Sequence, residues 1–304
     1  MINVQVRDET APLEEVLLGT AESFGPIPKI EDTYDPKSRY YLEKGQYPKQ
    51  QDVINELEKF KNVLERYNVD VYHPDSIEDC NQVFVRDLGF VVRNRFILSA
   101  IINKREKEIE GIIDHLVNLK PEVLRVPKGV RIEGGDVMPW RDYLFVGYSE
   151  DQDFEKYEVS RTNRLGIEFL KNTFPELKVI GIELVKSDDD PYQNALHLDC
   201  CFQPFGDDQC ILYEGGFKNK TDYEFLLNYF GETNTIKINQ EEMFRMNSNI
   251  FSINPKTVVS DPSFVRLNGE LRKMGMTVEE TPYQEISKME GLFRCTTLPF
   301  RRTY

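Results

Sequence analysis

The chain has 304 residues, of which 40% are hydrophobic and 30% charged, and its formal charge at pH 7 is −14. This length fits one large domain or two ordinary ones, and the apolar content is enough for a real core and excludes a disordered chain. The ring of repeats described below favours a single domain spanning 1–304. The negative charge argues against nucleic acid as the main partner, because phosphate binding needs a concentrated cationic surface. A cationic small molecule suits the chain better.

The amino terminus, residues 1–9, lacks the basic-then-apolar layout of a signal peptide. No window approaches 18 uninterrupted apolar residues, the length that a membrane-spanning helix needs. We therefore expect a soluble, cytoplasmic protein with no membrane partner.

The five cysteines are an odd number, and two of them are adjacent, which makes a poor disulfide framework for a chain of this size. Zinc at His197, Cys200, Cys201 and Cys210 is disfavoured, because these residues form no Cys-x-x-Cys pair and lie in an expected strand, where neighbouring side chains point to opposite faces. We expect reduced thiols, no metal and no cofactor.

The first expected elements are a strand at Leu13–Leu18, a strongly amphipathic helix at Gln50–Arg66 and a strand at Val69–Tyr72. The tyrosine-rich stretch 40–47 before that helix is interpreted as a packed loop, with a mobile lid as the alternative.

From Val83 onward the order strand, strand, helix, strand occurs four times. The residues between the first two strands of each unit are those that hairpin turns need, which strengthens each assignment. The expected elements are Val83–Val92, Phe96–Ile102, Lys104–Leu119 and Val123–Val126; Gly135–Pro139, Tyr143–Tyr148, Asn163–Asn172 and Lys178–Leu184; Leu196–Pro204, Cys210–Tyr213, Thr221–Phe230 and Thr235–Ile238; Asn249–Ile253, Thr257–Ser260, Ser263–Met274 and Thr277–Glu280.

A last strand at Cys295–Phe300 can complete a fifth unit with the amino-terminal elements. Pairing the first strand with the last would close a ring and leave no free sheet edge. The sequence thus predicts an α/β fold, a fivefold pseudosymmetric α/β propeller of ββαβ units. An ordinary open α/β sheet is the alternative.

Polar residues gather at the start of the first strand of each unit, and in a ring of equivalent units these starts converge on one axis. Alone, each has a structural explanation: Cys295 as an inert core thiol, His197 as a core histidine and the acids as surface charges. Together they can supply an activated thiolate, an acid–base group and an orienting carboxylate. They are Asn81 with Arg86 and Asp87, Glu133 to Asp136, His197 to Asp199, Asn247 with Asn249, and Arg294 with Cys295.

Several carboxylates around one thiol favour a planar cation such as guanidinium, whose paired N–H donors match carboxylates in a bidentate fork. The cation would also supply the positive charge that a thiolate needs, because nearby carboxylates otherwise raise the thiol pKa. We therefore expect a small guanidino molecule as the partner.

These residues resemble the signatures of the guanidino-modifying enzymes, a superfamily of arginine deiminases, dimethylargininases and amidinotransferases. The resemblance rests on Asn-Gln-Val-Phe-Val-Arg-Asp ending at Asp87, on Glu133-Gly-Gly-Asp136, on His197-Leu-Asp199 and on Gly291-Leu-Phe-Arg-Cys295-Thr-Thr-Leu-Pro. It runs in the family's order from about Leu13 to Arg302. The fold it implies is the fivefold α/β propeller.

The resemblance also implies a mechanism in which a thiol attacks the guanidinium carbon and forms a covalent amidino-cysteine, a thiouronium. The residues it assigns are the nucleophile Cys295, the acid–base residue His197 with its partner Glu133, the guanidinium-binding acids Asp87 and Asp199, and the further substrate-binding residues Asp136, Asn81 and Arg294.

Two departures from the family pattern leave the substrate open. An acidic insertion separates Ser149 from Arg161-Thr-Asn163, and Glu290-Gly291 stands where many relatives have consecutive glycines. We favour a deiminase-like hydrolase acting on arginine or a derivative, with an amidinotransferase as the main alternative and a non-catalytic guanidine-binding propeller as a further one. A homodimer is compatible with the sequence.

Overall fold

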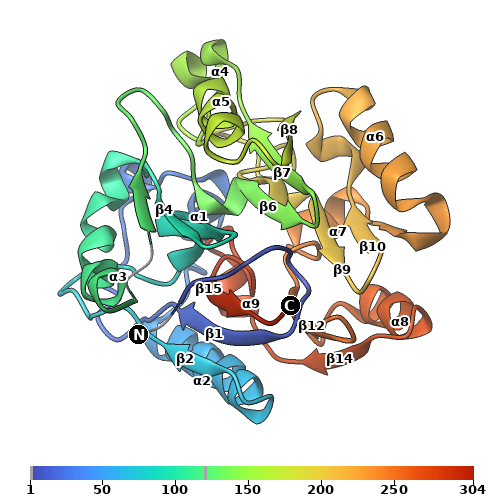
Figure 1. Ribbon diagram of the computed structural model, residues 1–304. Helices are drawn as coiled ribbons and strands as arrows, with labels where there is room; N and C mark the ends of the chain where they lie inside the picture. Colours follow the sequence, from blue (N-terminus) through green and yellow to red (C-terminus); the bar gives the residue numbers. More distant parts are fainter. Residues whose placement is uncertain (1–2, 120–121) are drawn as a thin grey trace.

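The computed structural model describes residues 3–119 and 122–304, which form a mixed α/β fold with five three-stranded sheets. In Figure 1 the sheets surround the middle of the molecule, and α2, α3, α5, α6 and α8 lie outside them. The strands are β1 (Leu13–Leu18), β2 (Asp70–Tyr72), β3 (Gly89–Val92), β4 (Arg95–Leu98), β5 (Glu122–Arg125), β6 (Val137–Trp140), β7 (Tyr143–Tyr148), β8 (Lys178–Glu183), β9 (Phe202–Phe205), β10 (Gln209–Leu212), β11 (Thr235–Lys237), β12 (Phe251–Asn254), β13 (Thr257–Ser260), β14 (Thr277–Glu280) and β15 (Thr297–Arg302). The α-helices are α1 (Pro36–Glu43), α2 (Gln50–Arg66), α3 (Ile113–Leu119), α4 (Asp151–Lys156), α5 (Arg164–Thr173), α6 (Lys220–Phe230), α7 (Gln240–Phe244), α8 (Val265–Lys273) and α9 (Gln284–Ser287).

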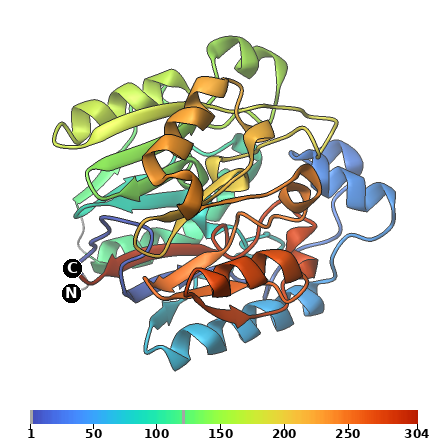
Figure 2. The same cartoon turned by 90° about the vertical axis from the view of Figure 1, so that its right-hand side faces the viewer.

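Every sheet has the same pattern, in which the middle strand runs antiparallel to one neighbour and parallel to the other. The chain ends share one sheet, because β15 pairs antiparallel with β1, with Leu17 opposite Leu298. The predicted pairing of the first and last strands is therefore confirmed. The alternative of one ordinary open α/β sheet is wrong, because the strands form five separate sheets. Figure 2 shows both termini on one face of the molecule and α1, in blue, on the opposite face.

The first strands begin later than the sequence pattern predicts. Short 3₁₀ turns occupy Val85–Leu88, Gly134–Asp136 and Leu198–Cys200, and β3, β6 and β9 start after them. Every residue of these turns is buried, and each turn contains one acid: Asp87, Asp136 and Asp199. Glu133 and His197 are the extended residues that directly precede the second and third turns.

Two other expectations are corrected. The stretch predicted as one helix over Lys104–Leu119 is a 3₁₀ helix at Asn103–Ile112 followed by α3. Arg105 of this 3₁₀ helix points inward and forms an ion pair with Asp87. This contact outweighs the α-helical periodicity of the sequence. The expected loop at 40–47 begins with the second half of α1. The amino terminus of this helix is capped by Asp35, which accepts a hydrogen bond from Ser38 N, and has proline at its first position.

Aromatic packing fixes the loop that precedes β15. Phe293 stacks on Tyr283, with ring centroids 4.3 Å apart, and lies edge-on to Phe60 of α2 at 5.1 Å. All three rings are buried. The loop that carries Cys295 is thus anchored in the core two residues before the cysteine. No helix among residues 3–119 and 122–304 has the length and apolarity to cross a membrane.

Replacing Leu298 with alanine tests the strand pairing that joins the chain ends. Leu298 is 0% exposed opposite Leu17, so the cavity should lower the free energy of unfolding by about 3 kcal/mol in a denaturant titration. Val265→Ala is the matched control, because Val265 is 76% exposed and its loss should change stability by less than about 0.5 kcal/mol. Equal stability changes in the two variants would contradict this role for β15.

Candidate active site

The thiol of Cys295 is buried, 3% exposed, and held between two side chains. Its Sγ lies 3.1 Å from Nδ2 of Asn249 and 3.6 Å from Oδ2 of Asp199. Oδ1 of Asn249 also accepts hydrogen bonds from the backbone N–H groups of Arg294 and Cys295. One asparagine therefore fixes both the backbone and the sulfur of the cysteine.

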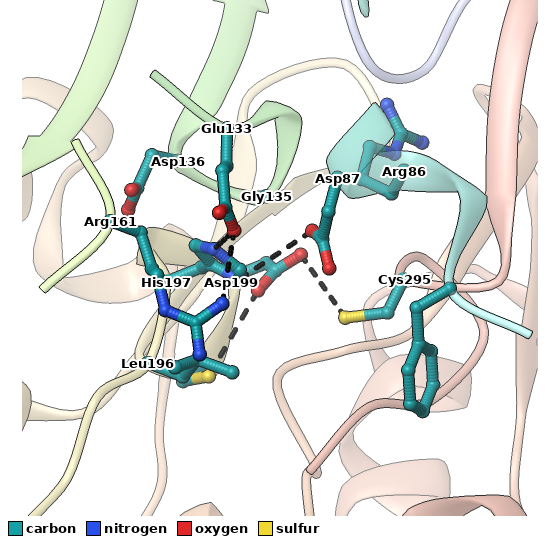
Figure 3. A network of polar contacts seen from close by, with 12 residues as sticks. Arg86, Asp87, Glu133, Gly135, Asp136, Arg161, Leu196, His197, Asp199 and Cys295 are labelled. Atoms are coloured by element: carbon teal, nitrogen blue, oxygen red, sulfur yellow. Dashed lines mark hydrogen bonds and ion pairs between the residues drawn. The ribbon is translucent and has the colours of Figure 1, made fainter. Parts of the chain in front are cut away.

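The imidazole of His197 faces two carboxylates. Its Nε2 lies 2.9 Å from Oε2 of Glu133, and its Nδ1 lies 3.7 Å from Oδ1 of Asp87. Gly135 packs directly against the ring, where a Cβ atom would come within 2.6 Å of the imidazole, so any larger residue would displace it. Figure 3 shows His197, Glu133, Asp87, Asp199 and Cys295 with their side chains directed toward one another.

Buried arginines pair with each of these acids. Arg105 donates to Asp87 at 2.6 Å, Arg161 lies 3.4 Å from Glu133, and Arg294 donates to Asp199 at 2.8 Å. The sequence did not predict that Arg105 and Arg161 form buried ion pairs with acids of the site. No sequence signal marks Arg105, whereas Arg161 was noted only as part of the run Arg161-Thr-Asn163.

The surroundings shift the pKa of the three central groups. Burial, and then the charges of Asp199 and Asp87, raise the pKa of the Cys295 thiol well above its usual range, so the thiol is neutral at pH 7. Burial alone would lower the pKa of His197, but Asp87, Asp136 and Glu133 together raise it. Burial alone would raise the pKa of Glu133, but the charges of Arg161 and His197 lower it to about 2.

The structure therefore brings together five of the eight predicted site residues, and the other three are placed differently. Asp136 is buried behind the histidine, and its Oδ1 accepts from the backbone N–H of Leu198. Arg294 is fully buried and its guanidinium also donates to Glu9 and to backbone carbonyls. Asn81 is half-buried, touches Met289 and lines a separate pocket of about 260 Å³.

Asp87, Glu133 and His197 each place one potential ligand atom within 4.8 Å of the others, a donor set that could hold a metal ion. In the structure, the same Glu133 oxygen contacts His197 and Arg161. The arrangement equally suits proton exchange through His197.

The acidic insertion leaves the second unit's motif intact. The inserted residues form α4. After this helix the chain comes back beside Ser149, which pairs with Asn163 and donates its backbone N–H to the carbonyl oxygen of Thr162. Arg161 thus reaches Glu133 despite the extra residues.

Alkylation by iodoacetamide, a neutral reagent that reacts with thiolates, should test the raised thiol pKa. Because the folded pKa lies above its ordinary value, labelling of Cys295 should be slow at pH 7 and accelerate only in the alkaline range. Asp199→Asn removes a negative charge beside the sulfur and should move the profile to lower pH, whereas the exposed control Asp207→Asn should not. A wild-type midpoint at or below pH 8, read by peptide mass spectrometry, would contradict the electrostatics.

Sequence comparisons match the chain to one family model and to a curated relative. Residues 31–302 match the family model described as N,N dimethylarginine dimethylhydrolase, eukaryotic. The chain is 28% identical over 221 residues to the uncharacterized protein YkgA of Bacillus subtilis, covering 73% of this chain and 70% of that protein.

Solved structures share the fold at low sequence identity. The amino-terminal domain of ArgZ, a cyanobacterial arginine dihydrolase, superposes with a TM-score of 0.79 at 17% identity, covering 95% of this chain and 97% of that one. The inosamine-phosphate amidinotransferase StrB1 of Streptomyces griseus superposes with a TM-score of 0.77 at 17% identity, covering 99% and 97%. Similarity at this level shows the fold alone, and the family match goes further: the chain belongs to the N,N dimethylarginine dimethylhydrolase family, within the superfamily of guanidino-modifying enzymes.

Proposed function

We propose that this protein hydrolyses the guanidino group of arginine or an arginine derivative through a covalent amidino-cysteine intermediate. The single observation that carries the proposal is the position of the Cys295 thiol beside Asp199, in the same buried constellation as the His197–Glu133 pair and Asp87. A thiol among carboxylates is a poor nucleophile alone, but it is suited to a substrate that brings its own positive charge.

Asp87 and Asp199 would bind the guanidinium nitrogens, because carboxylates accept paired N–H donors in a planar fork. The bound cation offsets the negative charges that keep the thiol protonated, so the thiol loses its proton to solvent only when substrate is present. Arg294 acts by holding Asp199 in place, and Asp136 acts by holding the backbone beside His197.

In the first half-reaction, the thiolate forms a C–S bond to the guanidinium carbon and a C–N bond breaks. Protonated His197 gives its proton to the departing amine, which leaves a cationic thiouronium on Cys295 and a neutral imidazole. Glu133 stabilises the protonated histidine beforehand and orients its ring.

In the second half-reaction, His197 takes a proton from water while the water oxygen bonds to the thiouronium carbon. The C–S bond then breaks, and the remaining hydroxyl proton passes to sulfur. A urea-type product, the Cys295 thiol and protonated His197 result, so the enzyme is restored.

We further propose that the five sheets make up a closed, pseudo-fivefold α/β propeller. Support comes from the repeated strand order and from the β1–β15 pairing. In such a ring the polar turns before β3, β6 and β9 and the loop before β15 would face one central cavity.

Product analysis distinguishes hydrolysis from amidino transfer. We expect purified protein to convert arginine or NG,NG-dimethylarginine to citrulline, with release of ammonia or dimethylamine. Cys295→Ala should abolish turnover, whereas Cys80→Ser should not, because Cys80 lies outside the constellation. Formation of ornithine only after glycine is added would replace the hydrolase with an amidinotransferase.

Variants of the histidine pair test the acid–base assignment. His197→Ala should lower kcat by about 100-fold or more, and Glu133→Gln by a smaller factor. Because Glu133 raises the pKa of His197, and the first half-reaction needs the protonated ring, Glu133→Gln should shift the alkaline limb of the kcat profile to lower pH. Wild-type rates in His197→Ala, or an unmoved alkaline limb in Glu133→Gln, would refute the assignment.

A further inference from the structure

The chain segment before β1 buries one acid. This segment is held against β15, because the backbone N–H of Gln5 donates to the carbonyl oxygen of Phe300. Asp8 then closes a turn by accepting the backbone N–H of Ala11 at 2.6 Å. Inside this turn Glu9 is only 3% exposed. Because a carboxylate is seldom buried without a partner, Glu9 needs a cation beside it.

Arg294, the residue before Cys295, is that cation. Its Nε lies 3.1 Å from Oε2 of Glu9, and its Nη2 lies 3.1 Å from Oε1 of the same carboxylate. Burial alone would raise the pKa of Glu9, but the charges of Arg294 and Arg86 lower it to about 2, so the carboxylate is ionised at pH 7. Glu9 and Arg294 thus form a bidentate pair with no net charge.

The guanidinium of Arg294 has no N–H donor to spare. Of the five donors that a guanidinium has, two are taken by Glu9. Nη2 also donates to the carbonyl oxygen of Val137 at 2.8 Å, and Nη1 donates to the carbonyl oxygen of Gly135 at 3.2 Å and to Oδ2 of Asp199 at 2.8 Å. Glu9 therefore occupies one whole edge of the guanidinium, and a single N–H remains for Asp199.

Asp199 consequently keeps one oxygen for a ligand. Its Oδ2 accepts from Arg294 and lies 3.6 Å from Sγ of Cys295. Its Oδ1 has, within residues 3–119 and 122–304, no hydrogen-bond donor other than the thiol of Cys200 at 4.0 Å. If its second edge were free, Arg294 could instead pair with both oxygens of Asp199, in the fork that arginine and carboxylate favour. That pairing would close the carboxylate to any other cation.

We propose that Glu9 is a positioning residue, which limits Arg294 to one contact with Asp199 and so keeps Asp199 open and negatively charged toward a bound guanidinium. The inference rests on the proposed function, in which Asp199 binds the substrate cation. Glu9 acts by geometry, because it occupies the second edge of Arg294. It also acts by charge, because it neutralises the arginine and leaves the charge of Asp199 uncompensated beside the sulfur.

Replacing Glu9 with glutamine keeps the shape of the side chain and removes its charge. The charge of Arg294 is then free to offset that of Asp199. The pKa of the Cys295 thiol should fall, because Asp199 raises it and Arg294 lowers it. A neutral alkylating reagent should therefore label Cys295 about tenfold faster at pH 7, whereas a cationic reagent should gain little, because Asp199 attracts it less.

Two reagents measure this difference without turnover. The rate of labelling of Cys295 by cationic chloroacetamidine is divided by the rate with neutral chloroacetamide, both read by peptide mass spectrometry at pH 7. This ratio should be about tenfold lower in Glu9→Gln than in the wild type, and Glu9→Asp, which keeps the charge, should stay within about twofold of the wild type. The control Glu14→Gln removes an acid from a partly exposed pair with Arg301 and should leave the ratio unchanged. A loosened nucleophile loop would speed both reagents alike, so an unchanged ratio in Glu9→Gln would overturn the proposal.

A double variant, Glu9→Gln with Arg294→Met, tests whether Glu9 acts through the arginine. It removes both members of a neutral pair, so the net charge of the core is unchanged and the protein should fold even if Glu9→Gln alone does not. Nothing then offsets the charge of Asp199, and the reagent ratio should be at least that of the wild type. A ratio below the wild type would mean that Glu9 acts independently of Arg294, and failure of the double variant to fold would make the pair a requirement of the fold; either result would refute the proposal.

Turnover separates this inference from the proposed function. For the guanidine that the wild type consumes, Glu9→Gln should raise KM by about tenfold and lower kcat by about twofold or less, because the cation binds less tightly while the thiolate forms more readily. A lower kcat with an unchanged KM would contradict the positioning role. If the wild type consumes no guanidine, the proposed function fails, and the reagent ratio still decides the role of Glu9.

Discussion

The structure depends on the balance of buried charge around one thiol. Asp87, Glu133 and Asp199 lie close to Cys295 or His197, and each is paired with a buried arginine. Removing one member of such a pair leaves an uncompensated charge in the core, which costs more than the pair itself contributes. The arginines thus hold the carboxylates in fixed positions around the thiol and the imidazole.

This balance of charge explains why the pKa of the Cys295 thiol and the pKa of the His197 imidazole are both raised. The carboxylates raise the pKa of Cys295 and, against the effect of burial, also that of His197. The surroundings therefore favour the neutral form of the thiol and favour protonation of the imidazole, and a cation near the sulfur would oppose the first of these effects. In the proposed reaction the substrate supplies that cation, so nucleophile activation is coupled to substrate binding.

Much of this could be predicted from the sequence, and the failures have identifiable physical causes. Strand and hairpin patterns located the repeated units, and the polar tips at Asp87, Glu133 and His197 were correctly expected to meet. Asp87 lies in a 3₁₀ turn, however, and Glu133 and His197 are the extended residues directly before two further 3₁₀ turns, which the strand pattern did not predict. Arg105 could not be recognised, since its charged neighbourhood resembles a solvated helix and only the tertiary contact with Asp87 turns it inward. Glu290 stood out as a departure from glycine, but its unpaired oxygen is visible only in the structure.

The most direct test of coupled activation compares two alkylating reagents that differ in charge. Chloroacetamidine is a guanidinium-like cation, and chloroacetamide is its neutral counterpart. At pH 7 the cationic reagent should label Cys295 much faster than the neutral one and in preference to the other four cysteines, and arginine should protect the residue. Equal labelling of all five cysteines, or equal rates for the two reagents at Cys295, would contradict the account.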